Sequence, residues 1–297
     1  MSLGGLYDVP APAKVNLFLH VVGRRADGYH LLQSLFVLID WADTLHFERR
    51  SDARLQRHDL GPALPDEDLT LAAARLLQTE SGTAQGCDIS IVKRVPWAAG
   101  LGGGSSDAAS TLLALNRLWG LGWSRARLAT LASRLGADVP FFIGGRNAFV
   151  EGIGERLTPL DVPRQWLALL KPAAGLGTRD IFTDPALRRD TPAVILSGFL
   201  ADAAKPGFWQ SGYGRNDLQP PAENRCPEVA QAAEWLRSRF GNSRMTGSGS
   251  AVFARGGMGD QPLVAWPADE LPLGWVGRMC RSLDRHPLIA WADEAPG

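Results

Sequence analysis

The stretch PWAAGLGGGSSDAAS, Pro96 to Ser110, decides how this chain folds and what it binds. It places four glycines within five residues, Gly100 and Gly102 to Gly104, directly before residues that favour a helix. Bare backbone N–H groups at the positive end of a helix attract anions, and glycines let a polyphosphate approach closely. The stretch therefore predicts a phosphate-binding loop that opens a helix, with Asp107 in its first turn.

This loop fits neither of the two most familiar nucleotide-binding loops. A P-loop needs a lysine after its last glycine, and no lysine lies between Lys93 and Lys171. A dinucleotide-binding fingerprint needs glycine or alanine at its sixth position, where this chain has Ser105, and an acidic residue about 20 positions later. A flexible loop without a ligand is the alternative, but glycines this dense cost backbone entropy that a ligand would offset.

Strand and helix patterns alternate around the loop. Runs rich in β-branched and aromatic residues, or with alternating polarity, predict strands at 14–23, 34–40, 43–50, 87–96 and 166–172, a hairpin at 147–160 and a strand after the glycine turn at 243–255. Helical spacing predicts helices at 66–80, 105–120, 124–136 and 227–241, with short helices at 185–204. The order indicates a mixed α/β protein.

Size and charge indicate a two-domain protein that acts on a small molecule. A chain of 297 residues suits two compact domains, and the patterns place a boundary near residue 160, between domains 1–160 and 161–297. The formal net charge is +0, and no run of four consecutive Lys or Arg occurs. This composition does not favour nucleic acid or a membrane surface as partner.

Cysteine usage and the N-terminal residues predict a cytoplasmic enzyme. Cys87, Cys226 and Cys280 lie far apart without metal-ligand spacing, which argues against a zinc site and against a disulfide framework. The N-terminal residues lack a charged segment followed by an apolar core, so no signal peptide is expected. No apolar run reaches the ~18–20 residues of a membrane span.

Three motifs in order resemble the GHMP superfamily of small-molecule kinases. PAKVNLFL at 12–19 is similar to its N-terminal motif, the glycine loop to its phosphate loop, and MTGSGSAVFA at 245–254 to its C-terminal glycine motif. The resemblance implies an ATP-dependent kinase with a two-domain GHMP fold. It implies an N-terminal domain similar to a small-subunit ribosomal protein, with a left-handed βαβ unit where right-handed ones are usual, and a ferredoxin-like C-terminal domain.

Four further motifs resemble one branch of this superfamily: GRRADGYHLLQSLF at 23–36, GADVPFF at 136–142, GLGTRDIF at 175–182 and GRNDLQ at 214–219. That branch phosphorylates the 2-hydroxyl of a cytidyl diphosphate sugar alcohol in the non-mevalonate route to isoprenoid precursors. The resemblance implies ATP and this alcohol as small-molecule partners and Mg²⁺ bound through the ATP phosphates. Monomer and dimer both stay open.

The resemblance also carries roles onto residues of this chain. It implies Lys14 and Asp138 as the catalytic pair, His30 as the reader of the cytosine edge, and Tyr29 and Phe182 as residues that stack on the base. Substrate contacts are implied for Asn16, Tyr29, His30, Lys93, Thr178 and Phe182, and a floor near the phosphates for residues 247–250. Contacts with the ATP phosphates are implied for Pro96, Trp97, Ala98, Ala99, Gly100, Leu101, Gly102, Gly103, Gly104, Ser105 and Ser106.

The implied catalytic pair suits phosphoryl transfer. Catalysis of a loose transition state is mostly positioning and charge neutralisation. An aspartate with a reference pKa of about 3.9 is a weak base, so Asp138 either orients the hydroxyl or takes its proton late. A neighbouring Lys14 ammonium would keep the carboxylate ionised and stabilise the migrating phosphoryl group. Mg²⁺ would keep several waters, with Ser105 or Ser106 as conceivable ligands.

Each assignment has an ordinary structural alternative. Asp138 could be a turn residue after a helix, and Tyr29 and His30 could belong to a hairpin turn. Phe182 could be a core residue and Lys93 an exposed strand residue.

Three rival functions also stay open: another GHMP kinase with a mevalonate- or homoserine-like substrate, a binding module without catalysis, and a dinucleotide oxidoreductase. The residues after Gly256 lack the regular helix that the resemblance leads one to expect, because prolines interrupt them.

Overall fold

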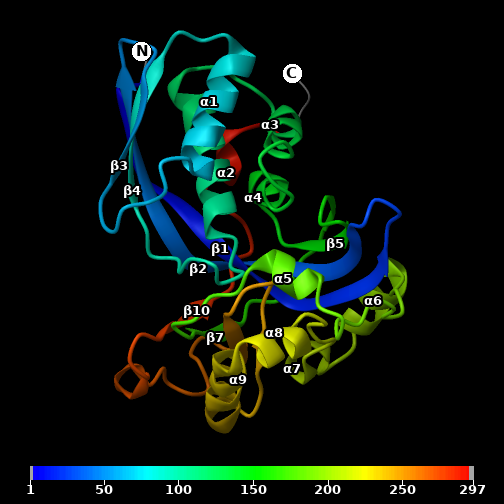
Figure 1. Ribbon diagram of the computed structural model, residues 1–297. Helices are drawn as coiled ribbons and strands as arrows, with labels where there is room; N and C mark the ends of the chain where they lie inside the picture. Colours follow the sequence, from blue (N-terminus) through cyan, green and yellow to red (C-terminus); the bar gives the residue numbers. More distant parts are fainter. Residues whose placement is uncertain (1–2, 294–297) are drawn as a thin grey trace.

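The computed structural model describes residues 3–293 as two β-sheets covered by helices (Figure 1). In that view the first sheet and helices α1 to α4 occupy the upper part, and the second sheet with α8 and α9 the lower part. The mixed α/β class expected from the sequence is confirmed. No helix within residues 3–293 combines the length and the apolar character that a membrane crossing requires.

The first sheet is built on two long paired strands. β1 (Gly5–Arg24) and β2 (His30–Arg50) run antiparallel, with register irregularities that bend the pair, including one between Asn16 and Leu19. The order along the sheet is β3-β4-β2-β5-β6, and β1 pairs with β2 off this path. The remaining strands are β3 (Leu55–Asp59), β4 (Gly86–Val92), β5 (Ala148–Gly152) and β6 (Arg156–Pro159).

A parallel crossover supplies the βαβ unit of this sheet. β3 and β4 pair in parallel, and helix α1 (Leu69–Ser81) connects them. The Asp68 side chain caps α1 by accepting a hydrogen bond from the Leu71 backbone N–H at 2.9 Å, and Gly82 ends it with a φ of 67°. The unit has the expected elements, and its left-handedness stays a prediction.

Helix α2 (Gly103–Leu118) lies in the centre of the first core. Apolar side chains on nearly all its faces are buried, because the sheet lies on one side and other helices on the other. The helices that pack against it are α1, α3 (Arg125–Ala132) and α4 (Val139–Gly144). Small residues such as Ala108 and Ala109 let the neighbouring backbones approach, so the N-terminus of α2 is held rigidly.

The second sheet has the strand order expected for a ferredoxin-like domain. Strands β7 (Trp166–Lys171), β8 (Arg244–Met245), β9 (Val252–Gly257) and β10 (Val276–Arg281) pair antiparallel in the order β10-β7-β9-β8. The first crossover carries α5 (Thr178–Phe182), α6 (Leu196–Ala203), α7 (Phe208–Ser211), α8 (Gln219–Arg225) and α9 (Pro227–Phe240). The second crossover, 258–275, contains only a 3₁₀ turn at Ala268–Glu270.

One sequence expectation for this half needs correction. The stretch 185–195 forms no helix, since only α6 lies within the expected helical range. The described segment after Gly256 lacks a regular helix, as expected, and β10 then closes the sheet against β7. Its strand pattern, VGRMCR, is short and preceded by Gly274, which hid it from periodicity alone.

The end of the described chain returns to the first sheet. The Leu283 N–H donates to the Leu38 carbonyl at 2.8 Å, and the His286 N–H donates to the Gly145 carbonyl at 2.8 Å. Leu288 is buried in the same core as helix α2. Because residues after β10 join the first core, the boundary expected near residue 160 stays a prediction.

Candidate active site

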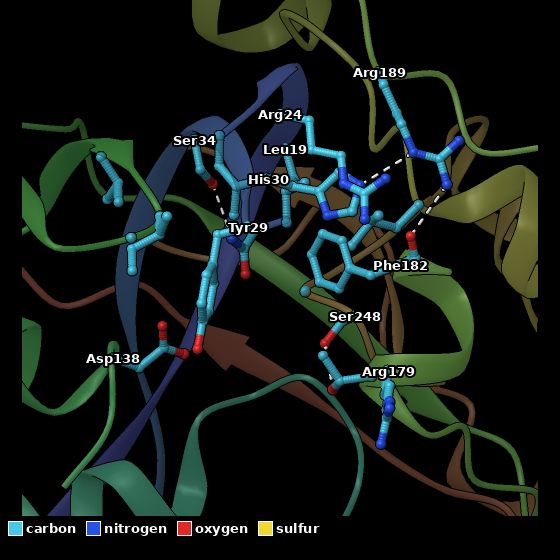
Figure 2. Close-up of a pocket in the computed structure, with 18 of the residues that line it drawn as sticks. Leu19, Arg24, Tyr29, His30, Ser34, Asp138, Arg179, Phe182, Arg189 and Ser248 are labelled. Atoms are coloured by element: carbon cyan, nitrogen blue, oxygen red, sulfur yellow. Dashed lines mark hydrogen bonds between the residues drawn. The ribbon is translucent and has the colours of Figure 1, made fainter. Parts of the chain in front are cut away.

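A cavity of about 900 Å³ is lined by residues from both halves of the chain. Figure 2 shows its side chains, which come from β1 and β2, the start of α4, helix α5 and the turn before β9. We name two groups of its lining residues after the roles expected from the sequence. The catalytic end is Lys14, Asn16, Ser34 and Asp138, and the base end is Tyr29, His30, Phe182 and Arg189.

Lys14 is the centre of the catalytic end. It lies on β1 with only 3% of its surface exposed, so strand geometry fixes its direction. Its Nζ donates to Asn16 Oδ1 at 2.6 Å, lies 3.5 Å from Asp138 Oδ2 and stands 4.4 Å from the centre of the Phe36 ring. A buried ammonium is thus held by one amide, one carboxylate and one aromatic face.

Asn16 links the catalytic end to its neighbours. Its Nδ2 donates to Ser34 Oγ at 2.8 Å, and Ser34 Oγ donates to the Phe18 carbonyl. The Asn16 backbone N–H donates to Thr246 Oγ1 at 2.7 Å, which ties β1 to the C-terminal glycine motif. The Asn16 amide is therefore oriented with its oxygen toward Lys14 and its nitrogen toward Ser34.

Asp138 immediately precedes helix α4 and caps no N–H group there. Pro140, in the first turn, has no N–H to satisfy, which reduces the need for a side-chain cap. About a third of the Asp138 side chain is exposed, and it lines the cavity opposite Lys14. The carboxylate is therefore free to meet a ligand.

The phosphate loop packs against the C-terminal glycine motif, backbone against backbone. A Cβ on Gly249 would lie 2.2 Å from the Ala99 carbonyl carbon, and one on Gly247 would lie 2.5 Å from the Gly100 carbonyl oxygen. The Ala251 N–H also donates to the Ala99 carbonyl at 3.2 Å. Glycine is required on both sides, because any side chain would push the two segments apart.

The N-terminus of α2 offers open hydrogen-bond donors. Among the described residues, the N–H groups of Gly103, Gly104 and Ser105 donate to no protein atom, as is usual for a first helical turn. Gly102 precedes them with a φ of 69°. Ser106 Oγ is buried and donates to the Pro12 carbonyl at 2.7 Å, so this hydroxyl is occupied. These three N–H groups can bind an anion.

Lys14 connects the loop to the cavity. Its backbone N–H donates to the Leu101 carbonyl at 2.9 Å, and a Cβ on Gly102 would lie 3.2 Å from its Cγ. The loop residues 96–106 do not themselves line the cavity described above. Lys14 therefore contacts the loop through its backbone and the cavity through its side chain.

The base end is formed by a turn and a short helix. Tyr29, 61% exposed, and His30 follow the β1–β2 turn, and Phe182 ends α5. The His30 and Phe182 rings lie 5.1 Å apart between centroids at an angle of 31°. Figure 2 shows Tyr29 on the opposite side of the cavity from Phe182. A flat ring could stack in this space.

A hydrogen bond from Arg189 holds the His30 ring. The Arg189 Nε donates to His30 Nε2 at 3.1 Å, drawn as a dashed line in Figure 2. Burial lowers the pKa of His30, and the nearby cations Arg189 and Arg24 lower it further. The imidazole is therefore neutral at pH 7.

Thr178 closes the cavity from the C-terminal half. It begins α5, and its Oγ1 lies 2.8 Å from Ser248 Oγ in the glycine motif. This contact joins the α5 segment to the glycine turn. Hydroxyl groups from two separate elements therefore meet on this side of the cavity.

Lys93 is not brought together with the other expected substrate residues. It lies outside the cavity, and its Nζ is held by Asp43 and, at 2.6 Å, by Asp107. Burial and the neighbouring Asp43 charge raise the pKa of Asp107, whereas the Lys93 ammonium lowers it; burial dominates, so the pKa rises to about 8. The ammonium lies near Gly103, at the start of α2. It joins strands β2 and β4 to that helix.

Sequence reasoning missed several residues of this cavity. Ser34, Phe36, Arg24 and Arg189 line it, although no motif assigned them a role. Ser34 and Phe36 alternate with buried apolar residues on β2, a pattern that also describes an ordinary core strand. Arg189 lies 159 positions from His30 in sequence, so only the fold reveals the contact.

The described residues contain no group of three or more His, Cys, Asp or Glu side chains that could hold a metal ion. A divalent cation that enters with polyphosphate is compatible with this arrangement, because Mg²⁺ binds through phosphate oxygens and water with few protein ligands.

Comparison with known families identifies two segments. The description "GHMP kinases N terminal domain" matches residues 68–146, and "GHMP kinases C terminal" matches residues 203–256. These segments contain the phosphate loop with α2 and the glycine motif that packs against it.

Full-length relatives are also found. The chain is 64% identical over 293 residues to the 4-diphosphocytidyl-2-C-methyl-D-erythritol kinase of Methylibium petroleiphilum, covering 98% of this chain and 100% of the relative. It is 54% identical to the enzyme of the same name from Variovorax paradoxus, covering 97% and 99%. A crystal structure of a 4-(cytidine 5'-diphospho)-2C-methyl-D-erythritol kinase matches with a TM-score of 0.74 at 36% identity, over 92% of this chain and 97% of the other.

Proposed function

The chain belongs to the 4-diphosphocytidyl-2-C-methyl-D-erythritol kinases of the GHMP kinase family, and on this premise we propose how its cavity performs the reaction. The protein is an ATP-dependent small-molecule kinase. It transfers the terminal phosphoryl group of ATP to the 2-hydroxyl of 4-diphosphocytidyl-2-C-methyl-D-erythritol, giving the 2-phosphate and ADP. The reaction belongs to the non-mevalonate synthesis of isoprenoid precursors.

The observation that carries the proposed mechanism is the pairing of Lys14 and Asp138. Their charged atoms lie 3.5 Å apart in the cavity, and the Lys14 backbone N–H donates to Leu101 of the phosphate loop. Asp138 would accept a hydrogen bond from the 2-hydroxyl and orient its oxygen toward the phosphoryl group. Lys14 would stabilise the negative charge that spreads over the transferred group. Asn16 holds the ammonium in place.

The phosphate loop, Pro96 to Ser106, would bind ATP. Its open N–H groups at Gly103 to Ser105 support this role, because they lie at the positive end of a buried 16-residue helix. The glycine motif at 247–250 would support the conformation of the loop through close backbone contacts. Mg²⁺ bound to the ATP phosphates would supply further charge neutralisation.

The base end would hold the cytidine group. Tyr29 and Phe182 would stack on the ring, and His30 would bind its edge. Four basic side chains line the cavity against two acidic ones, which suits a substrate with a diphosphate. They are Lys14, Arg24, Arg179 and Arg189, against Asp27 and Asp138. We assign Thr178 to the substrate rim and leave Lys93 as a predicted contact at the loop side.

We further propose that residues 1–160 act as the ATP-binding domain and residues 161–297 as the substrate-side domain, in the cytoplasm. The three described cysteines are unpaired and buried, which is compatible with a reducing compartment.

The experiment is a phosphoryl-transfer assay with ATP, Mg²⁺ and a panel of alcohols, followed by ³¹P NMR and mass spectrometry. We expect the cytidyl diphosphate methylerythritol to gain one phosphate, and mevalonate and homoserine to gain none. Turnover of mevalonate or homoserine in preference to the cytidyl substrate would refute the proposal.

A further inference from the structure

We infer that Arg189 is a positioning residue for base recognition: it fixes the His30 imidazole in the tautomer that reads cytosine and rejects uracil. The inference rests on the proposed function, because it concerns the base end of the same substrate. It adds a specificity device that no motif in the sequence indicated.

Arg189 is held rigidly without a carboxylate partner in the described chain. Its Nη1 donates to the Leu187 carbonyl at 2.9 Å, and its Nη2 donates to the carbonyls of Phe182 and Asp184 at 3.2 and 2.8 Å. Only Nε remains, and it points at His30. The guanidinium is therefore fixed by the segment that also carries Phe182.

The contact decides where the His30 proton lies. A guanidinium has donors and no acceptor, so the His30 Nε2 facing it must accept and carries no hydrogen. In the neutral ring the proton then sits on Nδ1. Within residues 3–293, this Nδ1 makes no hydrogen bond, and His30 lines the cavity. The base end thus presents one fixed N–H donor.

A fixed donor distinguishes the two pyrimidines. The ring of cytosine offers adjacent acceptors at N3 and O2, whereas N3 of uracil carries a hydrogen and would meet the His30 N–H donor to donor. An analogue that leaves a donor of the site unpaired, or that faces it with a second donor, is rejected more strongly than one that differs by a single methylene. A ring free to change tautomer would turn Nδ1 into an acceptor and lose the distinction.

The surrounding charges keep the ring neutral. The charged groups that face the cavity are Lys14, Arg24, Asp27, Asp138, Arg179 and Arg189. After burial, Arg189 and then Arg24 depress the pKa of His30. No carboxylate counters them on this ring, so Arg189 selects the tautomer and also disfavours protonation.

The first test measures kcat and KM with the cytidyl substrate and with its uridyl counterpart. Arg189→Met should raise the KM for the cytidyl substrate about tenfold or more with little change in kcat, and the cytidyl preference should fall by a similar factor. Arg188→Met is the matched control, since Arg188 is exposed and pairs with Asp190 alone. Unchanged KM and preference in Arg189→Met would overturn the inference.

The second test uses pH. In wild type the KM for the cytidyl substrate should not depend on His30 between about pH 6.5 and 8, because burial and the neighbouring cations hold the pKa of the ring below its ordinary value of about 6.5. In Arg189→Met the pKa of His30 rises, and protonation at low pH restores a hydrogen on Nδ1. The KM of the variant, relative to wild type, should therefore fall as the pH is lowered through that pKa. If the ratio of the variant KM to the wild-type KM does not change with pH, Arg189 has a merely structural role and the inference is wrong.

A double-substitution cycle separates Arg189 from its contacts with Phe182. In the His30→Ala background, Arg189→Met should add little to the KM, since Arg189 acts through the ring. Additive losses would contradict the inference.

Long-range ¹H–¹⁵N spectra of labelled histidine give an independent readout: wild-type His30 should show a protonated Nδ1 and an acceptor Nε2. If wild type turns over no cytidyl substrate at all, the proposed function fails. If wild type turns it over normally and Arg189→Met has the same KM and the same cytidyl preference, only this inference is refuted.

Discussion

The catalytic end and the base end of the cavity are built in different ways. Lys14 and Asn16 lie on the long strand β1 with 3% and 2% of their surface exposed, and each contacts a neighbour in the same end. Tyr29, 61% exposed, and Phe182 lie on a turn and on a five-residue helix. The difference teaches that the chemistry is positioned by the sheet, whereas the base is recognised by connecting segments.

This division follows from what each end must do. Phosphoryl transfer needs its groups within a fraction of an ångström, so residues on strands suit it. Stacking tolerates small displacements, because a ring offers a broad face. Substitutions at the catalytic end should therefore lower kcat, and those at the base end should raise the KM of the alcohol.

The largest effect should come from Asp138. Asp138→Ala removes the group that orients the hydroxyl, and kcat should fall about 10³-fold while the affinity for ATP stays nearly constant. Steady-state kinetics and equilibrium ATP binding measure the two quantities, and Asp138→Asn keeps the shape without the charge. A kcat near that of wild type would contradict the assignment.

Lys14→Met should follow, with kcat lowered about 10²-fold. The ammonium is buried, and methionine fills its volume without its charge, so the transition state loses stabilisation while packing is kept. Thermal unfolding should be recorded as a control, because Asn16 Oδ1 loses its donor. A variant with raised KM and normal kcat would move Lys14 from catalysis to binding.

His30→Ala should affect the base end alone. The KM for the cytidyl substrate should rise about 10- to 100-fold, and the KM for ATP should change less than about twofold. His58→Ala, on the exposed edge strand β3, serves as the control. Equal weakening of both substrates would erase the distinction between the two ends.

Tyr29 should contribute less than His30, since its ring is mostly exposed before the base binds. Tyr29→Ala should raise the KM of the cytidyl substrate about three- to tenfold, and Tyr29→Phe should change it little because stacking needs only the ring. A large effect of Tyr29→Phe would assign a role to the hydroxyl instead.

The smallest effect on activity at neutral pH should come from His286, which lies in neither end. Burial, followed by the Arg125 charge, lowers its pKa to about 3. Because the folded ring stays neutral, its stabilising contribution is present above about pH 6.5 and is lost as the pH falls from there toward 3. The unfolding temperature of wild type should therefore decrease more steeply below pH 6.5 than that of His286→Asn; parallel curves would contradict this.

The two ends also differed in how far the sequence revealed them. The glycine loop, Lys14 and Asp138 stand in recognisable motifs, and the helices α1, α2 and α9 follow plain apolar spacing, so these could be predicted. Strand β10 could not, because its residues follow an irregular segment and its pairing with β7 is tertiary. Arg189 escaped for the same reason, as its contact with His30 spans 159 positions. The resemblance placed Lys93 with the substrate, and the sequence did not show that Asp43 and Asp107, from other segments, hold its ammonium.

The central claim is that one cavity holds a reacting hydroxyl at one end and a cytidine at the other. The most direct test compares phosphorylation of the full substrate with that of the sugar alcohol lacking its diphosphocytidyl group, in wild type and in His30→Ala. We predict that truncation lowers kcat/KM about 10³-fold or more in wild type, since binding of the distant base positions the hydroxyl, and that His30→Ala has no further effect on the truncated alcohol. Equal efficiency with both alcohols would contradict the account.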